Sequence, residues 1–386
     1  MYNKNLIFVA ACLGMLLFGI VLITLGSILP AVVSHFALEP MAAGYLASLL
    51  PLGILAGSLF FGPIVDRYGY KQLLLLSSAL VCLSMEGIAF ATSILHLQLS
   101  IAGIGLAGGA INGGTNALVA DISDEQKGAR LSLLGVFFGL GALGMPVVLG
   151  ALSQSASYDR VLAWVGIAVL VPAAFFLVIR FPLPKQPQGF PLAAGAAIIK
   201  QRPLLLCAAA LFLESGLEGL VNNWTTTFLQ QKALAVTADA LFSLSCFVAG
   251  MTVTRLVLGW LLRRFTPYYV LFVSLTIAFA GSIVLMASTS LPLAVAGLIL
   301  LGIGLAAGFP VILAYVGNLY PTITGTAFGI VLTVALTGNM LLNYTMGVIA
   351  QANGMQKLPL VLAVSLVVMT LVIGSGRNVF VERKSS

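Results

Sequence analysis

Charge is the first thing that this sequence lacks. Charged residues make up 8% of the 386 positions, whereas a soluble domain carries about 25%. Hydrophobic residues make up 60% of the chain. So few charges cannot cover a water-facing surface, so a soluble globular protein is excluded and a polytopic membrane protein is indicated.

Metal-binding and nucleophilic side chains are also scarce. The chain has two His and four Cys, and no two cysteines stand in a CxxC spacing. The glycine-rich runs GIGLAGGAINGG and GIGLAAGFP lack the Lys-Ser/Thr that ends a phosphate-binding loop. These absences argue against a metal centre, a nucleotide site and an enzyme. We expect no cofactor, and a bound Na⁺ is the one exception left open.

Long apolar runs dominate what is present. Each has about 20 residues or more, enough to cross a hydrocarbon core of about 30 Å as a helix. The pattern predicts an all-α polytopic membrane protein with twelve transmembrane helices. The expected spans are 6–30, 42–64, 72–93, 97–120, 131–153, 161–182, 204–229, 239–262, 269–289, 292–317, 324–349 and 357–375.

Lys and Arg residues set the expected orientation. With the N-terminus inside, 14 of the 18 basic residues fall on the inner side and three, Arg160, Lys232 and Lys357, on the outer side. The remaining one, Arg255, lies within a span. Because inner loops are enriched in basic residues, we expect both termini in the cytoplasm and the chain in the cell (inner) membrane. The net charge of +7 reflects this bias and indicates no nucleic-acid partner.

The spans divide six and six. The longest inner connection, KQPQGFPLAAGAAIIKQRP, has three prolines and basic ends. We expect an N-terminal six-helix bundle over 1–183, a cytoplasmic linker over 184–203 and a C-terminal six-helix bundle over 204–386. GPIVDRYGYK follows the second span of one half, and GWLLRRFTPY follows the second span of the other. Such an internal repeat is typical of secondary transporters with a site between the halves.

GPIVDRYGYK resembles the loop signature of the major facilitator superfamily, roughly G-x-x-x-D-R-x-G-x-[KR]. The resemblance implies two bundles of six helices and a conformational latch that does not touch substrate. The implied latch residues are Gly62, Asp66, Arg67, Gly69 and Lys71. The second copy keeps Gly259 and Arg263 but lacks the acid.

Longer stretches resemble the fucose:proton symporter family, in particular its glucose/galactose branch. Residues 254–271, TRLVLGWLLRRFTPYYVL, are similar to a GR-x-x-G-x-W-L-x-x-R-F-x-P pattern, which places Arg255 at an intramembrane arginine of that family. Glu218 and Trp224 fall on its E-x-x-x-x-x-W. The first span, TLGSILP, and Asn112 in the fourth are neutral where the fucose symporter carries acids, so its coupling mechanism does not carry over.

Two acids stand within the expected seventh span. Glu214 and Glu218 lie one helical turn apart on one face, although an ionised Glu at a bilayer centre costs about 2.5–3.5 kcal/mol. Burial and mutual repulsion both favour protonation, which a proton carrier needs. We expect Glu218 to be the principal coupling residue, with Glu214 and Arg255 setting its charge state. A structural ion pair between Arg255 and one acid, and contact of Arg255 with substrate, remain open.

Amides and aromatics supply candidate substrate contacts. Amides both donate and accept hydrogen bonds, which suits a hydroxyl-rich ligand, and an aromatic face suits a sugar ring. Interhelical hydrogen bonding and an outer aromatic belt are the alternatives. The candidates are Asn112, Asn116, Asn222, Asn223, Trp224, Asn339, Asn343 and Tyr344.

The favoured hypothesis is a symporter that takes up a small polar solute such as a sugar with H⁺ or Na⁺ by alternating access. We expect it to work as a monomer in the lipid bilayer. The alternative is a proton-coupled drug or metabolite exporter of the same superfamily. Its antiporters usually carry an Arg in the fourth span, and LSIAGIGLAGGAINGG has none.

Overall fold

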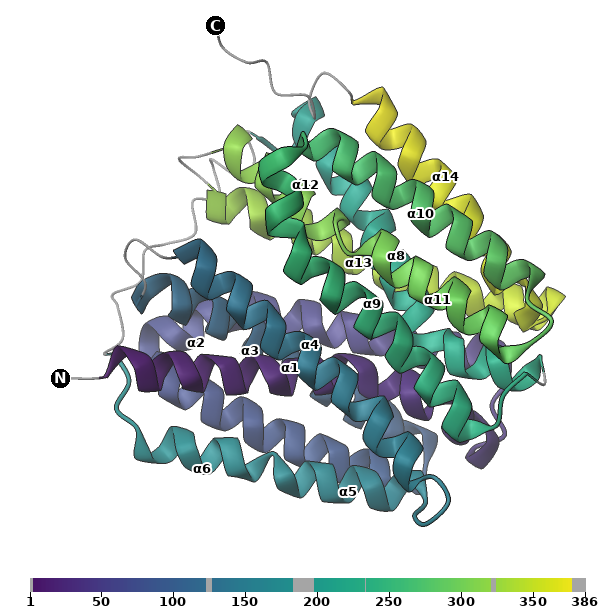
Figure 1. Cartoon of the computed structure of the whole chain (residues 1–386). Helices are drawn as coiled ribbons and strands as arrows, with labels where there is room; N and C mark the ends of the chain where they lie inside the picture. Colours follow the sequence, from purple (N-terminus) through teal and green to yellow (C-terminus); the bar gives the residue numbers. More distant parts are fainter. Residues whose placement is uncertain (1–2, 123–126, 183–197, 233, 321–323, 377–386) are drawn as a thin grey trace, which may run out of the picture. The chain divides into compact units, whose positions relative to one another are not determined.

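The computed structural model describes residues 3–122, 127–182, 198–232, 234–320 and 324–376 (Figure 1). All regular structure in these ranges is helical. The described helices are α1 (Lys4–His35), α2 (Pro40–Ala89), α3 (Ile94–Ile122), α4 (Lys127–Leu152), α5 (Tyr158–Ala168), α6 (Leu170–Val178), α8 (Arg202–Gln231), α9 (Thr237–Arg264), α10 (Pro267–Ala287), α11 (Leu291–Leu305), α12 (Gly308–Leu319), α13 (Thr324–Asn353), the short 3₁₀ helix η1 (Met355–Lys357) and α14 (Leu358–Ser375).

Twelve helical stretches of the described chain are long and apolar enough to cross a membrane. Their ends lie within a few residues of those expected from the sequence, so the prediction of an all-α chain with twelve spans is confirmed. α2 holds two of them, Pro40–Phe61 and Arg67–Ala89. The chain turns at Gly69, near the start of the second of these spans, where the φ of 86° and ψ of 168° suit only glycine.

Two spans are interrupted. The span Tyr158–Val178 divides into α5 and α6 at Val169, and the span Leu291–Leu319 divides into α11 and α12 at Ala306 and Ala307. In each case a proline, Pro172 or Pro310, is the third residue of the following helix. Proline has no backbone N–H, so it is tolerated in the first turn of a helix. The apolar run continues through both interruptions.

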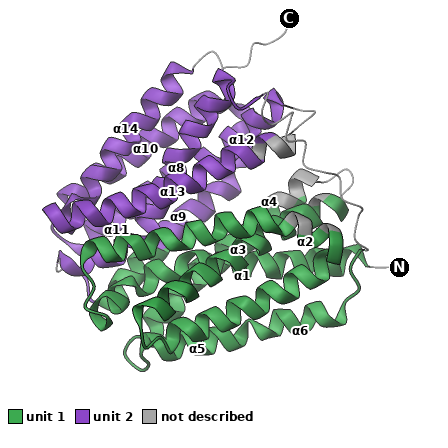
Figure 2. Cartoon of the chain, turned by 180° about the vertical axis from the view of Figure 1, so that it is seen from behind, with its two compact units in different colours: residues 1–188, 237–245 green, residues 189–236, 246–386 purple. Residues whose placement is uncertain are grey.

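The chain forms two compact units (Figure 2). Unit 1 comprises Met1–Gln188 and Thr237–Ser245, and unit 2 comprises Gly189–Val236 and Cys246–Ser386. The first part of α9 therefore groups with unit 1, and the remainder, with Arg255, groups with unit 2. Most of the expected linker, 184–203, lies outside the described residues.

Glycines allow helix backbones within each unit to approach closely. In unit 1, a Cβ on Gly57 of α2 would collide with the carbonyl of Leu106 on α3. In unit 2, a Cβ on Gly338 of α13 would collide with the carbonyl of Phe212 on α8. Close packing through small residues is how membrane helices associate where hydrophobic burial gives little drive. Gly109 and Gly302, one in each glycine-rich run of the sequence, make the same kind of close approach to a neighbouring helix backbone.

α8 is the most enclosed span that the structure describes. Of its most apolar window, 67% is buried, the largest share of the twelve. It packs against α11, α12, α13 and α14 in unit 2. Glu214, Asn222 and Asn223 in the middle of α8 are accordingly buried, and Glu218 is 14% exposed.

Candidate functional site

Arg255 of α9 reaches Glu218 of α8. The guanidinium nitrogen Nη2 donates a hydrogen bond to Glu218 Oε1 at 2.8 Å, and the same contact is an ion pair. The Arg255 and Glu218 side chains are 30% and 14% exposed. Of the alternatives that the sequence left open, the ion pair is present in this conformation, and it involves Glu218 rather than Glu214.

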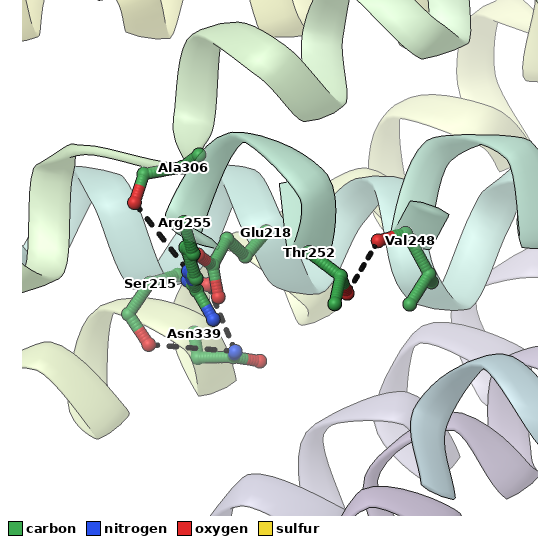
Figure 3. A network of polar contacts seen from close by, with 7 residues as sticks. All are labelled: Ser215, Glu218, Val248, Thr252, Arg255, Ala306 and Asn339. Atoms are coloured by element: carbon green, nitrogen blue, oxygen red, sulfur yellow. Dashed lines mark hydrogen bonds and ion pairs between the residues drawn. The ribbon is translucent and has the colours of Figure 1, made fainter. Parts of the chain in front are cut away.

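A second acceptor holds the guanidinium. Arg255 Nε donates to the carbonyl of Ala306 at 3.4 Å, where α11 ends (Figure 3). In a continuous helix this carbonyl would accept from the residue four positions on, which is Pro310, and proline has no N–H to donate. The following amide, that of Val311, does bond four residues back to Ala307 at 3.1 Å. Pro310 therefore leaves one carbonyl available, and Arg255 uses it.

Glu214 lies deeper in the packing than Glu218. Its side chain is fully buried, and neither carboxyl oxygen has a hydrogen-bond partner in the described structure. The carboxyl group rests on Gly308, the first residue of α12, so closely that a Cβ there would overlap it. Burying an unpaired charge is strongly unfavourable, so this position favours a neutral carboxyl group. The two acids, one turn apart, thus have different surroundings.

Several predicted substrate contacts form a polar network between α8 and α13. Asn343 Oδ1 accepts from Asn223 Nδ2 and from Trp224 Nε1, each at 3.0 Å. Asn343 Nδ2 donates to Asn339 Oδ1 at 2.9 Å. Asn339 Nδ2 in turn donates to the carbonyl of Ser215 at 2.8 Å, and Figure 3 shows this end of the network beside Arg255 and Glu218. The substrate role of these four residues stays a prediction, and in this conformation they bond to one another.

The other predicted substrate contacts lie apart from this network. Asn222 of α8 is buried, and its Oδ1 has no partner in the described structure. Tyr344 of α13 is 42% exposed. On α3 in unit 1, Asn116 Nδ2 donates to Asn112 Oδ1 at 3.0 Å. Only Asn222 among these combines burial with an unused acceptor.

The predicted latch residues lie at the turn of α2. Lys71 Nζ donates to the carbonyl of Leu177 at 2.7 Å and to that of Ile179 at 3.5 Å, and so caps the end of α6. Arg67 stacks on the ring of Tyr68 at 5.3 Å. The side chain of Asp66 and the surroundings of Gly62 lie outside what the structure describes. The conformational role of the motif stays a prediction.

Sequence reasoning missed several partners. Tyr70, inside the loop motif, donates to Asp121 Oδ2 at the end of α3 at 2.7 Å. The site also uses main-chain carbonyls, at Ser215 and Ala306, and the space left by the missing side chain of Gly308. A sequence gives little indication of such contributions. Pro310 was a usable signal, because a proline within an apolar span frees the carbonyl four residues before it.

Comparison with known proteins agrees with this architecture. The model of the Major Facilitator Superfamily matches residues 11–289 and 237–378. An uncharacterized transporter, y4wD, of Sinorhizobium fredii (strain NBRC 101917 / NGR234) is 25% identical over 352 residues, which cover 89% of this chain and 91% of that protein. The arabinose-proton symporter of Escherichia coli (strain K12) is 30% identical over 183 residues, 47% of this chain and 38% of the symporter.

Solved structures show the same fold at low identity. A bacterial homologue of the human lysosomal transporter Spinster superposes with a TM-score of 0.83 at 15% identity, covering 98% of this chain and 97% of that one. A D-xylose-proton symporter superposes with a TM-score of 0.80 at 16% identity, covering 99% and 98%. With the family match over most of its length, the chain belongs to the major facilitator superfamily.

Proposed function

We propose that this protein is a secondary active symporter that moves a small hydroxyl-rich solute, in particular a sugar, with H⁺ or Na⁺ by alternating access. The partial similarity to an arabinose-proton symporter supports this proposal. So do the motifs shared with the fucose:proton symporter family, the subfamily that we propose. A proton-coupled exporter remains the alternative, and no contact in the described structure favours it over uptake.

The cluster of Glu214, Glu218 and Arg255 carries the proposal. Charged residues inside a span are costly, and in transporters they mark ion pathways. Here two acids lie one turn apart in the most enclosed span described; one pairs with Arg255, and the other rests on Gly308, where a span is interrupted. Two acids and one cation leave one unit of negative charge, which a transported cation can neutralise. A purely structural ion pair would need only one acid.

The remaining predictions join this proposal. The chain works as a monomer of two six-helix bundles, 1–183 and 204–386, joined by a linker over 184–203, with both termini in the cytoplasm. Its latch is the motif of Gly62, Asp66, Arg67, Gly69 and Lys71. Asn112, Asn116, Asn222, Asn223, Trp224, Asn339, Asn343 and Tyr344 are its substrate contacts.

Uptake by proteoliposomes tests the function. Purified protein in sealed vesicles is offered a panel of radiolabelled sugars and polyols under an inward H⁺ gradient, an inward Na⁺ gradient or neither. We expect one group of sugars to accumulate above the outside concentration under one gradient only. Accumulation of no solute under either gradient, or driven efflux of amphiphilic drugs instead, would defeat the proposal.

A further inference from the structure

We propose that Glu214 is the proton-binding group of this site, and that Pro310 acts as a positioning residue that commits Arg255 to Glu218. This inference rests on the proposed cation coupling and specifies the ion and the acid. The sequence motif marks Glu218 as the principal coupling residue, and this inference assigns the proton to Glu214 instead.

The two carboxyl groups differ in what surrounds them. Glu218 accepts a charged hydrogen bond at 2.8 Å and is partly exposed. Glu214 is fully buried with two unpartnered oxygens, and it presses on the backbone of Gly308. An ionised carboxylate needs donors or a cation, whereas a protonated one tolerates burial. The proton of the pair therefore belongs on Glu214.

The helices packed against α8 bring little charge to the surroundings of Glu214. α11, α12, α13 and α14 contain no Asp, Glu, Lys, Arg or His in their described lengths. Their titratable side chains are the tyrosines Tyr315 and Tyr344. η1 carries Lys357 at an exposed position near the start of α14. Glu218 and Arg255 are therefore the charged groups that act on Glu214.

Two acceptors bind the Arg255 guanidinium. One is Glu218, and the other is the Ala306 carbonyl that Pro310 leaves unbonded in the helix. Two of the three guanidinium nitrogens, Nε and Nη2, bond to these acceptors, and no hydrogen bond joins Arg255 to Glu214 in the described structure. Without a donor, the buried Glu214 carboxyl group takes its neutral form from a proton. A metal ion such as Na⁺ would need several oxygen ligands, and the main chain of Gly308 fills the space beside the carboxyl group.

The proton balance follows from these contacts. An O–H bond forms on Glu214 when the site meets water on one side of the membrane, and the proton comes from that water. The bond breaks, and the proton returns to water on the other side, when Arg255 leaves Glu218 and Ala306 and stabilises the Glu214 carboxylate. Each cycle then carries one proton, and no other reactant is needed.

Infrared spectroscopy tests the assignment without a known substrate. Full-length protein in micelles of an alkyl maltoside, a detergent without a carbonyl group, is measured at neutral pH for the C=O stretch of a protonated carboxylic acid, which is resolved from the amide band and shifts in D₂O. We expect Glu214→Gln to lose a component of this band and Glu218→Gln to keep it. Loss of the component in Glu218→Gln with retention in Glu214→Gln would overturn the proposal, as would no loss in Glu214→Gln.

Two further variants supply a control for the infrared assignment and a test of the role of Pro310. Glu86→Gln is the matched control, because Glu86 on α2 also has a buried oxygen without a partner but lies in unit 1; the Glu214 component should survive it. Pro310→Ala keeps both acids and returns an N–H to the Ala306 carbonyl. We expect it to weaken the component, because Arg255 is freed to reach Glu214. An unchanged component in Pro310→Ala would refute the positioning role, even if Glu214→Gln failed to fold.

The infrared result and the uptake result can fail separately. If no solute is taken up, the proposed symport is contradicted, but the infrared assignment of the proton to Glu214 is unaffected. Conversely, robust Na⁺-driven uptake with no protonated carboxyl component at Glu214 would support symport and overturn this inference. Monodisperse elution and an unchanged amide band show that each variant is folded.

Discussion

At the scale of single residues, the two glutamates of α8 should respond differently to the same substitution. Glu218→Gln leaves Arg255 without its charge partner in a partly buried place, and we expect a loss of about 1–3 kcal/mol of stability. Glu214→Gln preserves the shape of a protonated acid, so we expect a smaller loss. Thermal unfolding of the detergent-purified variants measures both.

The ion pair itself is isolated by adding Arg255→Met to each glutamine variant. Loss of Arg255 should add little to Glu218→Gln, because the two residues share one interaction, and should add its full effect to Glu214→Gln. Equal losses in the two single variants would contradict the different surroundings of the two acids.

Asn343 and Asn222 make a second contrast between neighbouring amides. Asn343→Leu removes the acceptor of Asn223 and Trp224, and each buried donor left unpaired costs about 1–3 kcal/mol. Asn222→Leu leaves no described donor unpaired, so its unfolding temperature should fall less. If Asn222 contacts the solute, uptake should suffer more in Asn222→Leu than its stability does.

A counterflow assay with the solute found by the uptake panel separates stability from binding. Normal uptake by Asn222→Leu would remove it from the proposed substrate contacts. An unchanged unfolding temperature in Asn343→Leu would mean that the network between α8 and α13 stabilises little.

The sequence identified the charged and amide residues of the site but not their partners. Glu214, Glu218 and Arg255 stood out because charges are rare within apolar spans. Arg255 donates to the main-chain carbonyl of Ala306, and the Glu214 carboxyl group rests on Gly308, which has no side chain. Every residue has a carbonyl, so only packing decides which one is used. The pairing of Arg255 with Glu218 rather than Glu214 depended on that packing.

At the scale of helices, the junction of α11 and α12 is built around the absence of a side chain at Gly308. Gly308→Ala would place a methyl group against the Glu214 carboxyl group, and we expect a loss of about 1–3 kcal/mol from overpacking. Gly259→Ala is the matched control, because a Cβ at Gly259 of α9 meets nothing within 4 Å. It should change stability by less than about 1 kcal/mol, in the stabilising direction.

A second substitution shows whether the clash is the cause. Glu214→Ala removes the carboxyl group, so Gly308→Ala should cost much less in that background. If Gly308→Ala destabilises both backgrounds equally, the carboxyl group is not what the methyl group meets.

Helix positions were predictable because hydropathy alone sets the length of a span. The interruption of the span Leu291–Leu319 was not predicted, since Ala306 and Ala307 are as compatible with a helix as their neighbours. Gly69 differs from them, because it stands in the charged loop motif between two apolar runs. A turn at the membrane surface changes composition, and an interruption inside the apolar core does not.

At the scale of the whole molecule, Lys71 is expected to act on movement rather than on binding. It follows the turn of α2 at Gly69 and caps the end of α6. Lys71→Met removes a charge-assisted hydrogen bond worth about 1.5–3 kcal/mol, so we expect uptake to slow by about tenfold. Equilibrium binding of the same solute should stay within a few-fold, because this loop is not among the proposed substrate contacts.

Lys357→Met is the control for loss of a lysine, since Lys357 belongs to η1 in the other unit. It should transport normally. If Lys71→Met loses binding while it remains folded and monodisperse, the loop acts on the substrate site and the proposed latch role is wrong.

The superfamily was predictable because its loop motif is short, charged and placed between two apolar runs. The solute and the coupling ion were not, because an amide inside a membrane can serve packing as well as binding. The bonds from Asn343 to Asn223, Trp224 and Asn339 illustrate this ambiguity. A list of residue types cannot separate the two uses.

The carbonyl that Pro310 leaves to Arg255 also has a historical consequence. The Ala306 carbonyl belongs to the main chain, so it is present whatever residue occupies that position. Arg255 therefore keeps one acceptor when Glu218 is replaced by a neutral residue, whereas Glu218 loses its partner when Arg255 is replaced. Lineages should therefore pass through states with the arginine and proline but without the acid, and rarely the reverse. An alignment of descendants would show Arg255 and Pro310 disappearing together, after Glu218.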